Sequence, residues 1–179
     1  HRILGIVNGE DFQIVYSDTP GVLKPNYRLQ ESMRRFSNSA LSDADVLLYV
    51  TDVFDSNEKN ADFIEMVNLN PASLILIINK IDLIDQEKLE VLVEKWKALL
   101  PRAEIFPVSA LEKFNVDVLF KRILHLLPES PPFFDKDQLT DKPARCFVTE
   151  IIREKILLNY DREIPYAVEV EVEQFKEED

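Results

Sequence analysis

Two continuous apolar segments constrain the fold of this chain more than any other feature of its sequence. Asp45–Asp52 reads DVLLYVTD and Ser73–Asn79 reads SLILIIN, so neither segment alternates between apolar and polar residues. Strands buried on both faces have this pattern, which is typical of a parallel sheet under helices. A helix is predicted between them, at Asn57–Leu69. The sequence therefore predicts an α/β sheet.

The alternation of strand and helix continues to Pro128. Asp85 can cap a helix, Ala103–Val108 is a short strand, and a second helix follows that strand. The two helices place their apolar residues on one face each: Leu89, Leu92, Val93, Trp96, Leu99 and Leu100 in the first, and Val116, Leu119, Phe120, Ile123 and Leu127 in the second. We predict a three-layer α/β domain at residues 1–128, with helices on both faces of the sheet.

The N-terminal part of this domain is predicted to start with a hairpin. Ile3–Val7 and Phe12–Tyr16 are short apolar strands joined by Asn-Gly-Glu-Asp, and the Asn-Gly pair is a strong turn signal. A helix is predicted from about Leu29 to Leu41.

The pattern changes after Pro128. Residues 129–143 are rich in proline and acidic residues and are predicted to form a linker. Ala144–Leu158 is an amphipathic helix with Val148, Ile151, Ile152 and Ile156 on one side. Pro165–Phe175 alternates between valine and glutamate, as a strand with one wet face does. One helix and one strand cannot make a core, so we expect residues 144–179 to begin a second domain.

Bulk composition argues against two functional classes for this stretch alone. The formal net charge of −12 argues against gripping a nucleic-acid backbone, which requires clustered lysine and arginine. The longest apolar runs are far shorter than the roughly 20 residues that a membrane-spanning helix needs.

Polar motifs follow three of the predicted strands, at the edge where α/β sheets bind their ligands. The first is Asp18-Thr19-Pro20-Gly21. Its carboxylate can hold a Mg²⁺-bound water, and the Gly21 amide can approach a terminal phosphate because no Cβ blocks it. When the motif is considered alone, an ordinary turn is the better explanation.

The second motif is Asn79-Lys80-Ile81-Asp82, directly after the run LILII. A carboxylate at Asp82 can accept two hydrogen bonds, from N1–H and the 2-amino group of guanine. Adenine lacks this donor pair and would leave the carboxylate desolvated and unpaired. The stem of Lys80 can cover the base, and the amide of Asn79 can tie neighbouring loops together.

The third motif is Val108-Ser109-Ala110, where small residues would let backbone N–H groups reach the O6 carbonyl of guanine. Ser-Ala carries little information by itself. Its value lies in its position 30 residues past Asn79, with one helix and one strand between the two motifs.

In this order, the motifs resemble the third, fourth and fifth motifs of translation-factor-type small GTPases. More narrowly, NGEDFQIVYSDTPGVLKPNYRLQESM, DQLTDKPARCFVTEIIREKIL and PYAVEVEVEQF are similar to the Era GTPase family over essentially the whole chain. The resemblance implies a P-loop GTPase-like sheet followed by the start of an α+β KH domain. It also implies a GTP-hydrolysing switch that binds small-subunit ribosomal RNA and acts in ribosome assembly. The implied protein is cytoplasmic and can associate peripherally with the inner face of the cell membrane.

The resemblance implies GTP or GDP and Mg²⁺ as cofactors and no metal cluster. The nucleotide-binding set it implies is Asp18, Thr19, Pro20, Gly21, Val22, Asn79, Lys80, Ile81, Asp82, Val108, Ser109 and Ala110. Within this set Asp18 would be the metal ligand, through water, and Gly21 would sense the γ-phosphate. Residues 22–28 would form the second switch.

The sequence also departs from the family. A GTPase needs a Gly-Xaa4-Gly-Lys-Ser/Thr loop to cradle the phosphates, and none of Gly5, Gly9 and Gly21 begins one. The first-switch threonine and the Gly-Xaa-Xaa-Gly loop of a KH domain are absent too. We expect the chain to be a fragment, truncated at both ends and inactive alone.

Three further points concern the rate of hydrolysis, the functional class and the second domain. Val22 stands where Ras-like enzymes carry a glutamine that orients water, which implies slow intrinsic hydrolysis. A pseudo-GTPase or pure interaction module, which has lost its phosphate loop, is the alternative from another functional class. A ribosome-associated GTPase with a different second domain is disfavoured by PYAVEVEVEQF.

Overall fold

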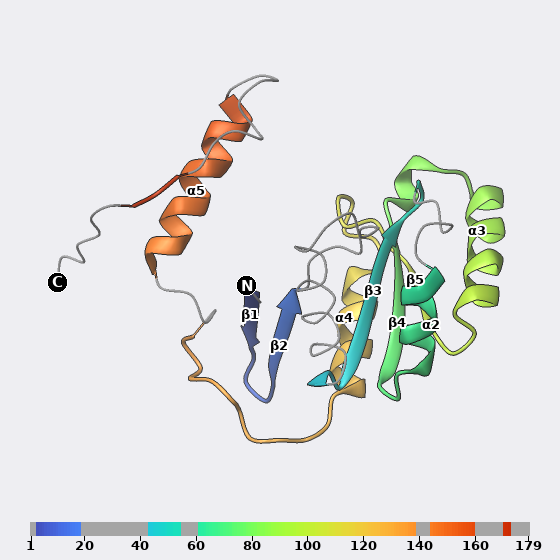
Figure 1. The fold of residues 1–179 in the computed structure, drawn as a ribbon, viewed down its shortest axis with the longest axis horizontal. Coiled ribbons are helices and arrows are strands. Elements are labelled where there is room, and N and C mark those ends of the chain that lie inside the picture. Colours follow the sequence, from blue (N-terminus) through green and yellow to red (C-terminus); the bar gives the residue numbers. More distant parts are fainter. Residues whose placement is uncertain (1–2, 19–42, 55–60, 139–143, 160–169, 173–179) are drawn as a thin grey trace.

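The computed structural model of the chain describes residues 3–18, 43–54, 61–138, 144–159 and 170–172 (Figure 1). The elements are β1 Ile3–Asn8, β2 Gln13–Asp18, β3 Val46–Asp52, α2 Ala61–Leu69, β4 Ser73–Asn79, a 3-10 turn Ile81–Leu83, α3 Gln86–Leu99, β5 Glu104–Pro107, α4 Val116–Leu126 and α5 Ala144–Asn159. The predicted helix Leu29–Leu41 lies outside the described residues. So does most of the strand predicted at Pro165–Phe175, and its described residues 170–172 form no strand.

The two apolar runs pair as parallel strands. β3 lies beside β4, and β4 lies beside β5, in a sheet with the order β3-β4-β5. The register of β3 and β4 runs from Val46 opposite Ser73 to Asp52 opposite Asn79. The predicted parallel sheet is confirmed, and the bounds of β4 are those read from the sequence.

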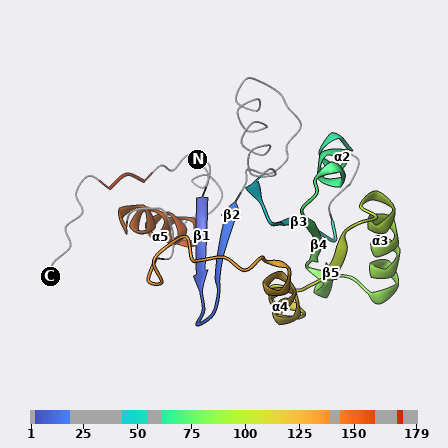
Figure 2. The same ribbon diagram turned by 90° about the horizontal axis from the view of Figure 1, so that it is seen from below.

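Both faces of β4 are covered, which explains its unbroken apolar run. Leu74, Leu76 and Ile78 belong to a core that also contains buried residues of α2 and α3. Ile75 and Ile77 belong to a second core, on the side of α4. Figure 2 shows α4 on one side of the sheet and α2 and α3 on the other. The predicted three layers are confirmed.

The ends of the helices follow local chemistry. Asp85 caps α3 as predicted, because its Oδ1 accepts the Lys88 N–H at 2.9 Å. In α4, burial begins at Leu119 and continues at Ile123. The prediction that Val116 also faces the core is wrong: it lies in the first turn of α4 and is exposed. A helix buries only the part of its length that lies over the sheet.

The hairpin β1–β2 is confirmed as an antiparallel pair, with Asn8 opposite Gln13. Its turn lies one residue later than the Asn-Gly signal predicts, because Asn8 still belongs to β1. The loop is closed by the Gly9 N–H, which donates to the carbonyl oxygen of Phe12 at 2.9 Å. Gly9 is not left-handed. A Cβ there would meet the Phe12 ring at 2.2 Å, so close packing explains the glycine.

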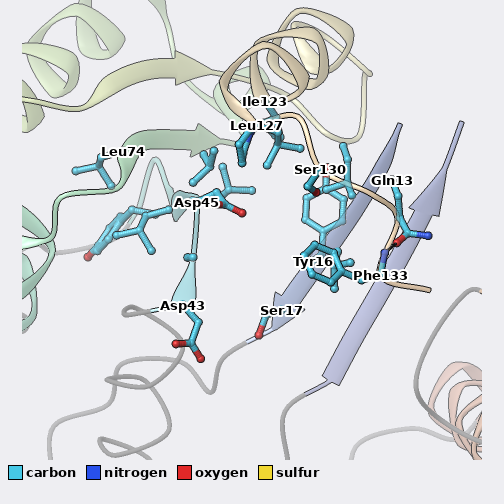
Figure 3. A pocket seen from close by; sticks show the side chains of 18 of the residues that line it. Gln13, Tyr16, Ser17, Asp43, Asp45, Leu74, Ile123, Leu127, Ser130 and Phe133 are labelled. Atoms are coloured by element: carbon cyan, nitrogen blue, oxygen red, sulfur yellow. Dashed lines mark hydrogen bonds between the residues drawn. The ribbon is translucent and has the colours of Figure 1, made fainter. Parts of the chain in front are cut away.

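A groove of about 550 Å³ separates β2 from β3, and no ladder joins the two strands. Figure 3 shows Tyr16 and Ser17 of β2 on one side and Asp45, just before β3, on the other. Burial raises the pKa of the Tyr16 phenol above its usual value of 10.0. The domain therefore consists of a hairpin and a parallel sheet that lie side by side without strand pairing.

The segment after α4, predicted to be a linker, is held against the hairpin by the side chain of Gln13. Its Oε1 accepts the backbone N–H groups of Phe133 and Phe134, at 2.8 and 3.0 Å. Its Nε2 donates to the carbonyl oxygen of Phe134 at 2.8 Å. The start of this segment is thus docked on the domain.

Replacing Gln13 by alanine is expected to release Phe133 and Phe134 from the hairpin, because one side chain makes all three of these bonds. Amide exchange at Phe133 and Phe134 should accelerate by roughly tenfold, as expected when about 1–1.5 kcal/mol of hydrogen bonding is lost. NMR-detected hydrogen exchange measures this. Gln86→Ala is the control, since among the described residues the Gln86 side chain bonds to Glu90 and not to this segment. Unchanged exchange at both phenylalanines would contradict the docking.

α5 lies apart from the β3-β4-β5 sheet in Figure 1. The predicted helix is confirmed, but Ile151 and Ile152 of its apolar side are 55% and 42% exposed. Phe147 and Leu158 are exposed as well. Among the helices of the described residues, none combines the length and the apolar character needed to cross a bilayer.

Candidate functional site

The second and third motifs meet at one edge of the sheet. Asn79 ends β4, and Val108 follows the end of β5, the next strand in the sheet. The Val108 N–H donates to the carbonyl oxygen of Ile78 at 2.8 Å, and the Ile81 N–H donates to that of Val108 at 3.3 Å. Two loops that lie far apart in the sequence are therefore joined through their backbones.

The side chain of Asn79 ties the same two loops. Its Oδ1 accepts the Lys80 N–H at 2.8 Å and the Ala110 N–H at 3.0 Å. Lys80 has φ 64°, in the left-handed region that non-glycine residues rarely adopt. Such a conformation persists only where the surroundings impose it, and it often marks a functional loop.

Ser109 orients the carboxylate of Asp82. Its hydroxyl donates to Asp82 Oδ1 at 2.5 Å and accepts the Glu112 N–H at 3.1 Å. Ser109 is only 1% exposed, whereas Asp82 is exposed. An ionised carboxylate has about four acceptor positions, so Asp82 keeps both the capacity and the access to bind a ligand that offers two donors.

The backbone N–H groups of the third motif are not free. The Ser109 N–H donates to the carbonyl oxygen of Phe114 at 3.2 Å, and the Ala110 N–H donates to Asn79. The sequence predicts that such groups reach the O6 carbonyl of guanine. In this arrangement Ala110 can do so only by sharing its hydrogen between Asn79 and the ligand.

Asp52 also lies at this edge of the sheet, although none of the three sequence motifs predicts it. Its carboxylate Oδ2 lies 2.6 Å from Lys80 Nζ. The signal was its place at the end of the apolar run DVLLYVTD, which puts it opposite Asn79 in the ladder. An acidic residue that ends a buried strand beside a ligand edge is a candidate of the same kind as Asp18.

The first motif is described only in part. Asp18 ends β2 and is exposed, on the hairpin side of the groove. Thr19, Pro20, Gly21 and Val22 lie outside the described residues. Among the described contacts, Asp18 forms no hydrogen bond with the loops after β4 and β5. The structure thus brings together the predicted base-reading residues at the ends of β4 and β5.

A family model of the elongation factor Tu GTP-binding domain matches residues 6–129. Among curated proteins, the GTPase Era of Alkaliphilus metalliredigens is 39% identical over 178 residues, which are 99% of this chain and 60% of that protein. The GTPase Era of Ruminiclostridium cellulolyticum is 34% identical, with the same coverage. The chain spans about 60% of the length of these relatives.

Solved structures of Era proteins are also similar to this chain. Era in complex with MgGDPNP and nucleotides 1506–1542 of 16S ribosomal RNA superimposes with a TM-score of 0.79 at 34% identity, covering 93% of this chain and 57% of that one. A variant of Aquifex aeolicus Era bound to GDP and AlF4⁻ gives a TM-score of 0.77 at 33% identity, covering 92% and 57%.

Proposed function

Because the chain belongs to the family of the elongation factor Tu GTP-binding domain, and within it to the Era GTPases, we propose that it supplies the guanine-reading half of a GTP-hydrolysing switch. The observation that carries this proposal is the Asp82 carboxylate, which the buried Ser109 hydroxyl holds at the ligand edge of the sheet.

Guanine fits the residues at this edge. N1–H and the 2-amino group are adjacent donors, and Asp82 offers an oriented pair of acceptor oxygens. Adenine would leave those oxygens desolvated and unpaired, a mismatch that discriminates far better than shape does. Asn79 holds the loop after β5 against the loop after β4, through its bond to Ala110.

The phosphate side of the proposed site requires a loop that this chain does not contain. We propose that the strand preceding such a loop lies in the groove between β2 and β3. β2 and β3 point the same way in Figure 1, and a strand parallel to both would join the hairpin to the sheet. Its carboxyl end would then emerge at the edge where Asp18, Asp52 and Asn79 end their strands.

The phosphates and Mg²⁺ would meet this chain at the first motif. Asp18 is proposed to hold Mg²⁺ through water, with Gly21 close to the γ-phosphate. Mg²⁺ prefers oxygen ligands and keeps several waters when it binds with substrate phosphates, which suits one exposed carboxylate. Val22 leaves the attacking water without a glutamine to orient it, so we propose slow intrinsic hydrolysis.

Residues 144–179 are proposed to begin a KH-type RNA-binding domain. The exposed apolar side of α5 supports this, since such a side requires a partner to cover it. The related Era structure that contains 16S ribosomal RNA supports small-subunit ribosomal RNA as the ligand of the whole protein, with a role in ribosome assembly. A cytoplasmic location with peripheral membrane association stays a prediction.

Replacing Asp18 by alanine in the full-length polypeptide should weaken GTP binding about tenfold more than GDP binding when Mg²⁺ is present. The difference corresponds to one charge-assisted contact of about 1.5 kcal/mol, made where the γ-phosphate shares the metal. Dissociation constants measured with Mg²⁺ and with EDTA would show it. Glu129→Ala, at an exposed acid after α4, is the control. Equal losses for GTP and GDP would remove the metal role from Asp18.

A further inference from the structure

Asp52 lies beside the base-reading loop, although none of the three motifs includes it. It is the last residue of β3, and its Cα is paired with that of Asn79 across the β3–β4 ladder. Both oxygens of its carboxylate make contacts within the described residues. Oδ1 accepts the backbone N–H of Phe54 at 2.9 Å, and Oδ2 meets Lys80 Nζ at 2.6 Å. The bond from the Phe54 N–H fixes the orientation of the carboxylate in the turn after β3. The Lys80 ammonium group therefore contacts a carboxylate whose position is already fixed.

The Lys80 side chain is consequently fixed at both ends. Its backbone is held in the left-handed conformation next to Asn79, whose Oδ1 accepts the Lys80 N–H. Its ammonium group is held by Asp52. The side chain is half exposed, at 50%, and that of Asp52 is 27% exposed. The aliphatic stem between the two fixed ends therefore lies along the ligand edge with part of its surface in solvent.

From this arrangement we propose that Asp52 is a positioning residue of the guanine site, which stretches the Lys80 stem into the wall that one face of the base packs against. The inference rests on the proposed function and adds to it the residue that shapes this wall. An exposed ion pair contributes little to folding stability, so its value here lies in ordering the lysine.

The physical basis is conformational entropy. A free lysine side chain populates many rotamers, and a ligand that packs on its stem must immobilise it, which weakens binding. When Asp52 holds the ammonium in the ligand-free protein, that loss has already occurred. The carboxylate also neutralises the lysine charge locally. Asp52 should therefore strengthen binding through the base, so its effect on affinity should be the same for nucleotides with two and with three phosphates.

The test is a calorimetric titration of the full-length polypeptide with GDP and with GTP. Four proteins are compared: the wild type, Asp52→Asn, Lys80→Met and the double variant. Asparagine keeps an oxygen that accepts the Phe54 N–H, so the turn after β3 is retained. Methionine keeps most of the stem and removes the ammonium. Thermal unfolding of each variant shows that it is folded.

We expect Asp52→Asn to weaken the binding of GDP and the binding of GTP by the same factor, about three- to tenfold. This is the loss expected when one side chain is no longer ordered before the ligand binds. In the Lys80→Met background the same change should have no further effect, because the two residues act as a pair. Glu104→Gln, which breaks the Glu104–Arg122 ion pair between β5 and α4, should leave both affinities unchanged.

Wild-type affinity in Asp52→Asn would overturn the inference and leave the guanine site standing. An equal loss in the Lys80→Met background would also overturn it, since Asp52 would then act without the lysine. A wild-type protein that binds neither GDP nor GTP would instead refute the proposed function, and the inference with it.

Discussion

Replacing Asp82 by asparagine is expected to lower the affinity for GTP at least about 100-fold and to raise the affinity for XTP. The carboxylate would accept two hydrogen bonds from guanine, and the asparagine amide presents a donor in place of one acceptor. Xanthine carries a carbonyl group where guanine carries its 2-amino group, so the amide donor matches it. The Ser109 hydroxyl donates to Oδ1 of Asp82, and the Oδ1 of an asparagine can accept the same bond, which leaves the amide group for the ligand.

Competition against a fluorescent guanine nucleotide, on the full-length polypeptide, measures both affinities. Glu112→Gln is a matched control, because Glu112 lies in the neighbouring loop and bonds Ser109 only through its backbone N–H. It should change neither affinity. If Asp82→Asn kept the affinity of the wild type for GTP, the assignment of the base pocket would be wrong.

Replacing Trp96 by alanine is expected to destabilise this chain by about 3–5 kcal/mol, the usual range for removing a large aromatic side chain from a core. Trp96 is 1% exposed and lies in the core between α3 and the sheet. Its ring centroid is 5.4 Å from that of Tyr49. Its Nε1–H is buried and has no partner among the described residues.

Trp96→Phe should therefore cost much less than Trp96→Ala, because phenylalanine keeps most of the packing and removes a buried donor whose burial alone costs about 1–3 kcal/mol. Urea unfolding of the chain followed by circular dichroism measures both, since the only tryptophan is lost in these variants. Val91→Ala, at an exposed position of α3, should have little effect. Equal losses for the two Trp96 variants would contradict the expected benefit of removing the buried Nε1–H.

The parallel sheet could be predicted because both of its long strands are buried on two faces. β4 shows this most clearly: its five central residues are all buried, so the sequence contains no polar position that would blur its bounds. The cap at Asp85 was predictable for a similar reason, since one side chain meets one nearby backbone group. Features that depend on a single local segment can be read from that segment.

Other features depend on contacts that the sequence does not display. Asp52 and Lys80 are 28 residues apart, and only the register of β3 on β4 brings them together. The Gln13 clamp joins residues more than 100 positions apart. In both cases tertiary packing brings together residues that lie far apart in the sequence.

The same reasoning explains which site residues could be foreseen. Asn79, Asp82 and Ser109 were predicted together because each follows a strand, and parallel strands end at one edge of their sheet. That Ser109 would donate to Asp82, and that Ala110 would already be bonded to Asn79, required the geometry of both loops.

Titration of the full-length polypeptide with GDP and ADP, in the presence of Mg²⁺, decides whether Asp82 reads guanine. We expect GDP to bind and ADP to bind at least about 100-fold more weakly, because adenine cannot satisfy Asp82. Equal binding of the two nucleotides would contradict guanine recognition by this edge. Binding of neither would leave an interaction module that keeps the fold of a GTPase without its nucleotide chemistry.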